Sequence, residues 1–215
     1  MRTRLCETFG IEFPIFAFSH CRDVVAAVSR AGGFGVLGAL AFSAEQLELE
    51  LKWIDAHVDG KPYGVDVVMP AKYEGKGGDV DGSKEALERL IPEAHREFVK
   101  GLLAAYEVPE LGEGEKPESL LSWTQGGGRS QVDVALRHNI KLLVNALGPP
   151  PKDVVEKAHA QGIKVAALVG TAAQAVKQVA AGVDIIVAQG TEAGGHTGEV
   201  ATMVLTPEVV DAVHP

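Results

Sequence analysis

The chain has 215 residues, of which 20 are Lys or Arg and 29 are Asp or Glu, so its formal net charge is −9 at pH 7. Hydrophobic residues make up 46% of the sequence and charged residues 23%, proportions typical of a globular protein rather than a disordered or fibrous one. The acidic excess, with no cluster of Lys and Arg, argues against nucleic acid or an anionic membrane as a partner.

The two cysteines, Cys6 and Cys21, predict neither a disulfide framework nor a zinc site, and the sequence contains no CxxC or HExxH motif. No apolar run approaches the ~20 residues that a membrane-spanning helix needs, and none near the N-terminus has the length of a signal sequence. We therefore expect a cytoplasmic protein with reduced thiols and no bound metal.

Apolar runs typical of buried strands alternate along the chain with helical patterns. The predicted strands span residues 13–18, 34–38, 63–69, 140–144, 165–169 and 183–187. Their apolar residues are continuous rather than alternating, which indicates strands covered on both faces, as in parallel sheets. Six βα units in series predict an α/β fold. Both a doubly wound sheet and a (β/α)8 TIM-type barrel satisfy this pattern, and in a barrel the active-site groups follow the strands.

Local signals predict where several of the helices begin. Ser43 and Gln46 have the spacing of a capping box. The helix that follows presents one apolar face, formed by Leu47, Leu51, Ile54 and Val58. Thr171 can cap a later helix. Near the end of the chain we expect an extended segment over 200–205 and a last helix that starts with the Thr-Pro pair at 206–207.

The βα rhythm breaks over residues 72–128. This segment holds glycine-rich and charged fragments, a charged helix around 84–106, and a glycine run at 125–128 that closes it. Its apolar content is too sparse for an independent core. We therefore expect one domain over residues 1–215, with an insertion at about 72–128.

The most informative segment is the glycine-rich loop at 187–199, which leaves the last predicted strand. Gln189 can both donate and accept hydrogen bonds, which suits the edge of a heterocycle. Gly194 and Gly195 let the backbone come close to a planar ligand or a phosphate. His196 titrates near neutral pH and could take a proton from a carbon acid. The simpler alternative is a surface loop with a solvated histidine.

Other positions carry weaker signals. His20 follows the first strand and could be a ligand or a base, although a histidine at such a junction is more commonly structural. Asp66 interrupts an apolar strand, where a carboxylate must find partners. Segment 125–129 could cradle an anion, although a flexible loop tip is the commoner reading of such glycines. The glycines within 32–35 form no GxGxxG motif, so a Rossmann-type dinucleotide site is not expected.

The run QGTEAGGHTG at 189–198 resembles the signature of the nitronate monooxygenases, formerly called 2-nitropropane dioxygenases. Four further segments support the resemblance by their order: GIEFPI at 10–15, AGGFG at 31–35, YGVD at 63–66 and GVDIIVAQ at 182–189. The resemblance covers nearly the whole chain except the insertion. It implies a TIM-barrel enzyme that uses FMN to oxidise alkyl nitronates with O₂, giving a carbonyl compound and nitrite.

The resemblance also implies roles for residues of the glycine-rich loop. Carried over by motif position, His196 would be the catalytic base or the group that orients the substrate. Gln189 and Gly194 would contact FMN, with Gly195 alongside.

The first and third strands would complete the implied cofactor site. Ala17, Phe18 and Ser19 would lie against the flavin. Asp66 stands where the family usually has Asn after Gly-Val, and an acid there could place a repulsive charge near a reduced flavin. The expected partners are a small-molecule substrate and O₂, and a homo-oligomer is compatible with the pattern.

Two alternatives remain open. A flavin-dependent enoyl-acyl-carrier-protein reductase also combines a barrel with a His after a glycine pair, and it would need a nicotinamide donor. The other is a non-catalytic fragment that holds no FMN.

The length bears on both alternatives, because a complete (β/α)8 barrel needs ~250 residues. We therefore expect a C-terminally truncated enzyme of about six βα units. It would lack the loops after strands seven and eight, which usually hold a phosphate in such barrels.

Overall fold

A computed structural model of the chain describes residues 2–69, 89–109, 125–195 and 197–214, and only the backbone of residues 125–127. The described part contains a sheet of six strands: β1 (Phe16–Ser19), β2 (Phe34–Gly38), β3 (Tyr63–Val67), β4 (Leu142–Asn145), β5 (Lys164–Val169) and β6 (Ile185–Ala188). Neighbours pair in chain order and every pair is parallel.

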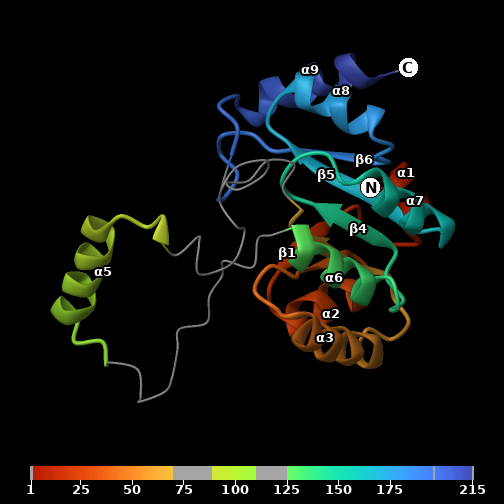
Figure 1. The fold of residues 1–215 in the computed structure, drawn as a ribbon. Helices are drawn as coiled ribbons and strands as arrows, with labels where there is room; N and C mark the ends of the chain where they lie inside the picture. Colours follow the sequence, from red (N-terminus) through yellow and green to blue (C-terminus); the bar gives the residue numbers. More distant parts are fainter. Residues whose placement is uncertain (1, 70–88, 110–124, 196, 215) are drawn as a thin grey trace.

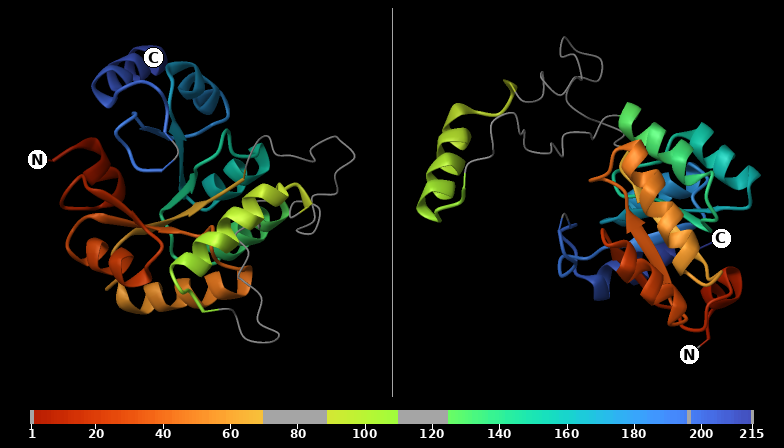
Figure 2. Two further views of the ribbon diagram at one scale, coloured as in Figure 1. Left: turned by 90° about the vertical axis from the view of Figure 1, so that its left-hand side faces the viewer. Right: turned by 90° about the horizontal axis from the view of Figure 1, so that it is seen from below.

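The sheet curls, and most of the helices lie along its outer side, so the strands form part of a barrel (Figures 1 and 2). The predicted barrel of six βα units is confirmed. A doubly wound sheet is excluded because its strand order reverses at a switch point, whereas here the order follows the chain throughout.

Helices alternate with the strands on the convex side. These are α2 (Arg22–Arg30), α3 (Ala44–His57), α6 (Gln125–Ala135), α7 (Lys152–Ala160), α8 (Ala172–Ala180) and α9 (Thr202–Val213), preceded by α1 (Arg4–Phe9). The two helices α8 and α9 pack on each other, as do α3 and α6. No helix in the described ranges has the length and hydropathy needed to span a bilayer.

Alternation along each strand divides the apolar core into an outer and an inner layer. The outer layer joins Tyr63, Val65 and Val67 of β3 to the apolar faces of the surrounding helices. In the inner layer, Phe34 and Val36 of β2 pack with residues of two further strands and of α1. These are Leu142 and Val144 of β4, Ala166 of β5, and Cys6 and Phe9 of α1. Helix α1 therefore packs against the inside of the curled sheet.

Two predicted helix starts are confirmed in detail. Gln46 donates its backbone N–H to Ser43 Oγ at 3.2 Å, and Ser43 donates its own to Gln46 Oε1 at 2.8 Å, which completes the capping box of α3. The predicted apolar face of this helix is fully buried. Thr171 caps α8 by accepting the backbone N–H of Gln174 at 3.2 Å.

The glycine run at 125–128 is not the loop that we predicted, because it forms the first turn of α6. A Cβ on Gly128 would lie 2.6 Å from Met69 Cγ and 2.7 Å from Val68 O, so this helix approaches the end of β3 closely. Arg129, predicted to help cradle an anion, instead pairs with Asp153 of α7 at 2.6 Å. Tertiary contact therefore overrides the weak helix propensity of glycine.

The last helix also differs from the prediction. Helix α9 begins at Thr202 instead of after Thr206, so part of the expected extended segment is helical and Pro207 lies inside the helix. The reason is a cap from a distant residue. Both carboxylate oxygens of Glu192 accept the backbone N–H of Thr202 at 3.0 Å. The buried side chains of Leu205 and Val209 then pack against α8.

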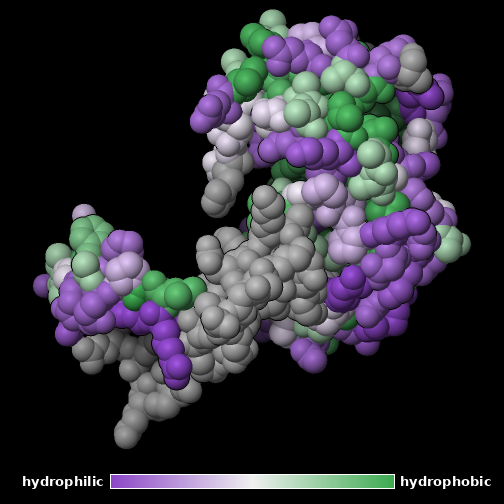
Figure 3. Space-filling view, turned by 45° about the horizontal axis from the view of Figure 1, so that its top comes forward, coloured by the Kyte–Doolittle hydropathy of each residue, from purple (hydrophilic) through white to green (hydrophobic). Residues whose placement is uncertain are grey.

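Helix α5 (Glu93–Ala105) is the described part of the predicted insertion, and it stands away from the barrel (Figures 1 and 2). It begins after Pro92, later than the predicted start, while residues 84–88 lie outside the described ranges. None of its side chains is buried, and Phe98 is 69% exposed on a surface with several apolar residues (Figure 3). The extent of the insertion and the single-domain organisation remain predictions.

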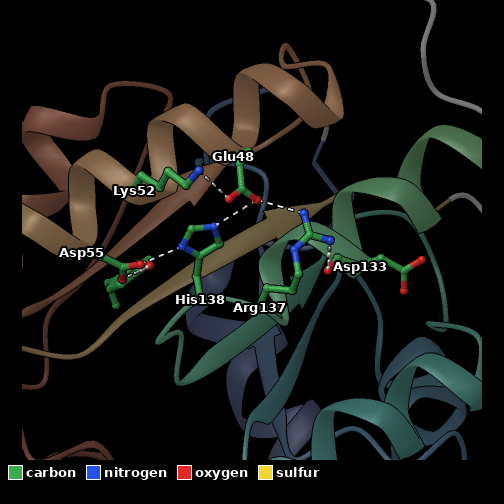
Figure 4. A network of polar contacts seen from close by, with 7 residues as sticks. Glu48, Lys52, Asp55, Asp133, Arg137 and His138 are labelled. Carbon is green, nitrogen blue, oxygen red and sulfur yellow. Dashed lines mark hydrogen bonds and ion pairs between the residues drawn. The ribbon is translucent and has the colours of Figure 1, made fainter.

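A polar network fastens α3 to the end of α6 on the outside of the barrel (Figure 4). The imidazole of His138 lies between two carboxylates of α3, with Nδ1 2.7 Å from Asp55 Oδ2 and Nε2 3.4 Å from Glu48 Oε2. Glu48 also pairs with Arg137 at 2.9 Å and with Lys52 at 3.2 Å.

This network predicts acid sensitivity. Hydrogen bonds from Arg137 and Lys52 lower the pKa of Glu48 from 4.5 to about 2. A carboxyl whose pKa is lower in the folded than in the unfolded state stabilises the folded protein at pH values above its unfolded pKa. That stabilisation is lost as the pH falls towards 2. Glu48→Gln should therefore flatten the pH dependence of the free energy of unfolding between about pH 5 and 2, measured by urea titration. In a matched control, Glu156→Gln should leave this dependence unchanged, and an unchanged profile in Glu48→Gln would contradict the prediction.

Candidate functional site

Because all strands are parallel, their carboxyl ends meet at one edge of the sheet. Ser19, Gly38 and Asn145 end β1, β2 and β4 there, and Gln189 follows β6. The candidate residues of β1, β3 and β6 therefore lie at the same end of the barrel, where active sites of this architecture are found.

At the end of β1, two rings cover a glycine of the neighbouring strand. Phe18 and His20 meet edge to face with centroids 5.0 Å apart. A Cβ on Gly38 would lie 2.5 Å from Phe18 Cζ and 2.7 Å from His20 Cε1, so a side chain at this position would displace the rings. His20 Nδ1 is 3.0 Å from Gly38 O, which gives this histidine a structural partner. Phe18 is 56% exposed and offers an apolar ring at the strand end.

The other two candidates of β1 are oriented differently. Ala17 and Ser19 alternate with Phe18, so their side chains lie on the opposite face of the strand. Ser19 Oγ accepts the backbone N–H of Cys21 at 3.0 Å, in the turn into α2. These two residues can therefore reach a ligand inside the barrel mainly through their backbone.

Asp66 lies on the inner face of β3, one residue before the strand ends. Its register partners are Gly38 on β2 and Val144 on β4, and it is 9% exposed. Its Oδ1 is buried with no hydrogen-bond partner in the described residues. Burial raises the pKa of this carboxyl from 3.8 to about 7, because a charge there would be poorly solvated. Asp66 is thus a buried acid that can keep its proton near neutral pH.

Asn145, at the end of β4, is a site residue that the sequence analysis missed. It is 1% exposed. Its Oδ1 accepts the backbone N–H of Met69 at 2.9 Å, and its Nδ2 donates to Gly148 O at 2.8 Å and towards Met69 O at 3.4 Å. This amide holds the segment after β3 against the loop after β4. A polar residue at the end of an apolar run was the available signal.

The loop after β6 is held against the end of β5. The backbone N–H of Gln189 donates to Val169 O at 2.8 Å, and its Nε2 reaches Gly194 O at 3.5 Å. A Cβ on Gly198 would lie 2.7 Å from Gly170 O and 2.8 Å from Gly170 Cα. Two glycine backbones are therefore in direct contact where the loop returns.

The same loop is anchored to α9 by Glu192. Hydrogen bonds from its own backbone N–H and from that of Thr202 lower the pKa of this carboxyl, which keeps it ionised as a helix cap. Gly194 and Gly195 are exposed, and a Cβ at either position would meet nothing within 4 Å. Their backbone therefore faces open space. His196 lies outside the described residues, so its role rests on the motif.

A cleft of about 460 Å³ opens at the ends of β4, β5 and β6. Its lining is mainly neutral and comes from the loops after these strands and from α8: residues 146–149, 168–170, 174, 177, 178, 189, 197 and 198. Gln178 is 2% exposed and its Oε1 has no hydrogen-bond partner in the described residues. The cleft thus brings Gln189 beside an unsatisfied buried acceptor, but its lining does not include Phe18 or Asp66.

A second hollow, of about 560 Å³, lies at the opposite end of the strands. Lys61, Lys141 and Lys164 line it, together with loop glycines. None of the predicted site residues borders this hollow, and helices α3 and α7 end beside it. Lys164 pairs with Asp184 at 2.9 Å, and Lys141 donates to Asn139 Oδ1 at 2.9 Å, so two of these lysines have partners within the chain. Of the predicted site residues, Gln189 lines the 460 Å³ cleft at the carboxyl ends of the strands.

Comparison with known proteins decides the family. The profile of the nitronate monooxygenases matches residues 2–214. The chain belongs to the nitronate monooxygenase family. The resemblance drawn from the loop at 189–198 is thereby confirmed at the level of the family.

The relatives of this nitronate monooxygenase family member are longer than the chain. A Mycobacterium tuberculosis protein, provisionally named a monooxygenase, is 59% identical over 218 residues, which cover 100% of this chain and 58% of that protein. A Staphylococcus saprophyticus protein, provisionally named a nitronate monooxygenase, is 26% identical over 231 residues that cover 100% of this chain and 59% of its own length.

Two solved structures share the fold. Nitroalkane oxidase from Streptomyces ansochromogenes superposes with a TM-score of 0.71 at 25% identity, covering 99% of this chain and 58% of that one. FabK from Thermotoga maritima superposes with a TM-score of 0.67 at 24% identity, covering 100% of this chain and 52% of that one. At this identity the likeness to FabK concerns the fold alone.

The contact between the two glycine backbones predicts a local sensitivity. Gly198→Ala should lower the free energy of unfolding by about 1–3 kcal/mol, because the new Cβ would press on backbone atoms that cannot rotate away. Gly194→Ala, in the same loop but with open space at its Cβ position, should be close to neutral. Equal stabilities of the two variants in chemical denaturation would show that the loop does not pack on β5 as described.

The buried acid predicts a stability loss with rising pH. The pKa of Asp66 is raised from 3.8 to about 7 in the folded state. Its protonated form therefore contributes fully to the stability of the folded protein below about pH 3.8, and this contribution is lost as the pH rises through 7. Asp66→Asn should match the parent near pH 4 and exceed it at pH 8 by a few kcal/mol, at about 1.4 kcal/mol per pKa unit. The exposed Asp133→Asn is the control for urea unfolding at both pH values, and equal pH profiles of parent and Asp66→Asn would refute the prediction.

Proposed function

We propose that this chain forms the flavin-facing part of an FMN enzyme that oxidises alkyl nitronates with O₂ to a carbonyl compound and nitrite. The observation that carries the proposal is the glycine-rich loop of the family motif beside a largely neutral cleft at the carboxyl ends of the strands. Cofactor sites of such barrels lie at this end. The chain spans 58% of the M. tuberculosis relative, so the proposed activity is that of an enzyme of the relatives' full length.

The residues present suit a flavin. The backbone of Gly194 and Gly195 faces open space and offers close approach to a planar ring. The Gln189 amide can donate to one edge atom of a heterocycle and accept from another. Phe18 of β1 adds an apolar ring, and Asp66 of β3 adds an unpartnered polar atom, on either side of the end of β2. FMN, when bound, supplies the redox chemistry, while the protein supplies orientation and electrostatics.

The remaining roles belong to the protein. We assign His196 as the base that takes a proton from the carbon acid or orients the nitronate beside the flavin. A neutral imidazole is suited to this role near pH 7, its usual titration range. The backbone of Ala17 and Ser19 lies along the strand end beside Phe18. The apolar inner layer below limits water near the reacting carbon, which favours reaction with O₂.

His196→Asn should bind FMN as the parent does and lose turnover of a nitroalkane-derived nitronate by about 10²–10⁴-fold, the usual contribution of a general base. Initial rates of O₂ consumption and nitrite release, with FMN fluorescence for binding, measure the two effects separately. His95→Asn, on the remote helix α5, is the matched control and should retain full turnover. Full turnover in His196→Asn would remove this histidine from the mechanism.

The same assay separates the alternatives. Turnover with O₂ in the absence of NAD(P)H supports nitronate oxidation, whereas strict dependence on NADH would indicate the flavin-dependent enoyl-acyl-carrier-protein reductase. A chain that takes up no added FMN, judged from its visible spectrum, would indicate a non-catalytic fragment. Partner proteins and a homo-oligomeric state remain predictions.

A further inference from the structure

Asp66 is unusual among the acids of the described residues because it is buried without a counter-charge. The carboxylates of Glu48, Asp55 and Asp184 all pair with cations or donors on the barrel surface. Asp66 instead points into the curled sheet, and its Oδ1 has no hydrogen-bond partner among the described residues. A buried polar atom in this state needs a partner from elsewhere, since leaving it unsatisfied is costly.

The neighbouring strands supply no charge that could hold Asp66 ionised. On β2 the register partner is Gly38, and on β4 it is Val144. Beyond β2, the titratable group after the end of β1 is His20, whose Nδ1 already contacts Gly38 O at 3.0 Å. On β5 the inner position beside Val144 is Ala166, and Lys164, nearer the start of that strand, pairs with Asp184.

The β6 loop contributes Glu192, whose negative charge could not stabilise an ionised Asp66. Glu192 is committed to the N-terminus of α9, where it accepts the backbone N–H of Thr202. Burial is therefore the cause that raises the pKa of Asp66 to about 7, and the acid keeps its proton under mildly acidic and neutral conditions.

A protonated carboxyl differs from a carboxylate in one decisive respect: it can donate a hydrogen bond. The Phe18 and His20 rings lie over Gly38, the register partner of Asp66, so an aromatic surface adjoins the carboxyl. An acceptor atom on the edge of such a ligand would complete the hydrogen bonding of Asp66. An ionised Asp66 would offer that acceptor only repulsion.

We propose that Asp66 acts as a neutral carboxylic acid that donates a hydrogen bond to an acceptor atom of the flavin ring, so that flavin affinity depends on its proton. The inference rests on the proposed flavin function and deepens it. It makes Asp66 a positioning residue whose protonation links cofactor retention to pH. The proton stays on the carboxyl oxygen, and no bond other than the hydrogen bond is formed or broken.

The test measures FMN affinity of the whole chain by fluorescence quenching from pH 5.5 to 8.5. In the parent, Kd should be lowest at the acid end and rise above neutrality, approaching about tenfold per pH unit once the acid has ionised. Asp66→Asn keeps a donor of nearly the same shape and cannot ionise, so its Kd should stay flat across this range. Asp66→Leu removes the donor and should bind FMN weakly at every pH.

A second measurement needs no cofactor. Titration of ¹³C-labelled aspartate carboxyls by NMR should show one resonance that changes near neutral pH in the parent and in Asp133→Asn, and that is missing from Asp66→Asn. This readout also shows whether each variant is folded, so loss of binding is separated from loss of structure.

The outcomes divide clearly. A Kd that is independent of pH in the parent, or one that varies equally in Asp66→Asn, would overturn the role of Asp66 while leaving the flavin function intact. Failure of every folded variant to bind FMN at pH 6 would overturn the flavin function, and with it this inference. An aspartate spectrum without a resonance that titrates near neutrality would overturn the inference alone.

Discussion

Parallel pairing of the strands in chain order is the constraint on which the other features of this molecule depend. Each strand is joined to the next by hydrogen bonds in a register that aligns Gly38, Asp66 and Val144 across three strands. Because the chain must return through a helix before each new strand, all helices of these units lie outside and all carboxyl ends lie at one edge. The polar residues there come from distant parts of the sequence, yet they share one end of the barrel.

Glycines set how closely the layers approach at several of these junctions. A Cβ on Gly35 would lie within 2.9 Å of three backbone atoms of Val25, so α2 packs directly on β2. Gly198 meets Gly170 in the same way, where the loop after β6 returns to the end of β5. The absence of side chains at Gly170 and Gly198 brings the loop backbone onto the end of β5, and both glycines line the cleft.

Two buried polar residues at neighbouring strand ends, Asn145 and Asp66, differ in whether their side chains find hydrogen-bond partners. Asn145 is hydrogen-bonded to the backbone of Met69 and Gly148, so its side chain holds the site's loops together. Asp66 sits one strand away with an unpartnered oxygen and a raised pKa. This contrast separates a residue that builds the site from one that is available to it, a distinction that identity and spacing alone do not make.

The sequence by itself determined the strands, the capping box of α3, the cap of α8 and the family motif, because these depend on local periodicity or on neighbouring residues. The predicted burial on both faces holds for β2, β3 and β4, but β1 and β6 are partly exposed because each pairs with one strand only in the described residues. Only the tertiary structure decided the start of α6 at a glycine run and of α9 at Thr202. There, contacts with Met69 and Glu192 outweigh local propensity. It also decided the roles of Asn145 and Asp66, since whether a buried polar atom finds a partner depends on residues far away in the chain.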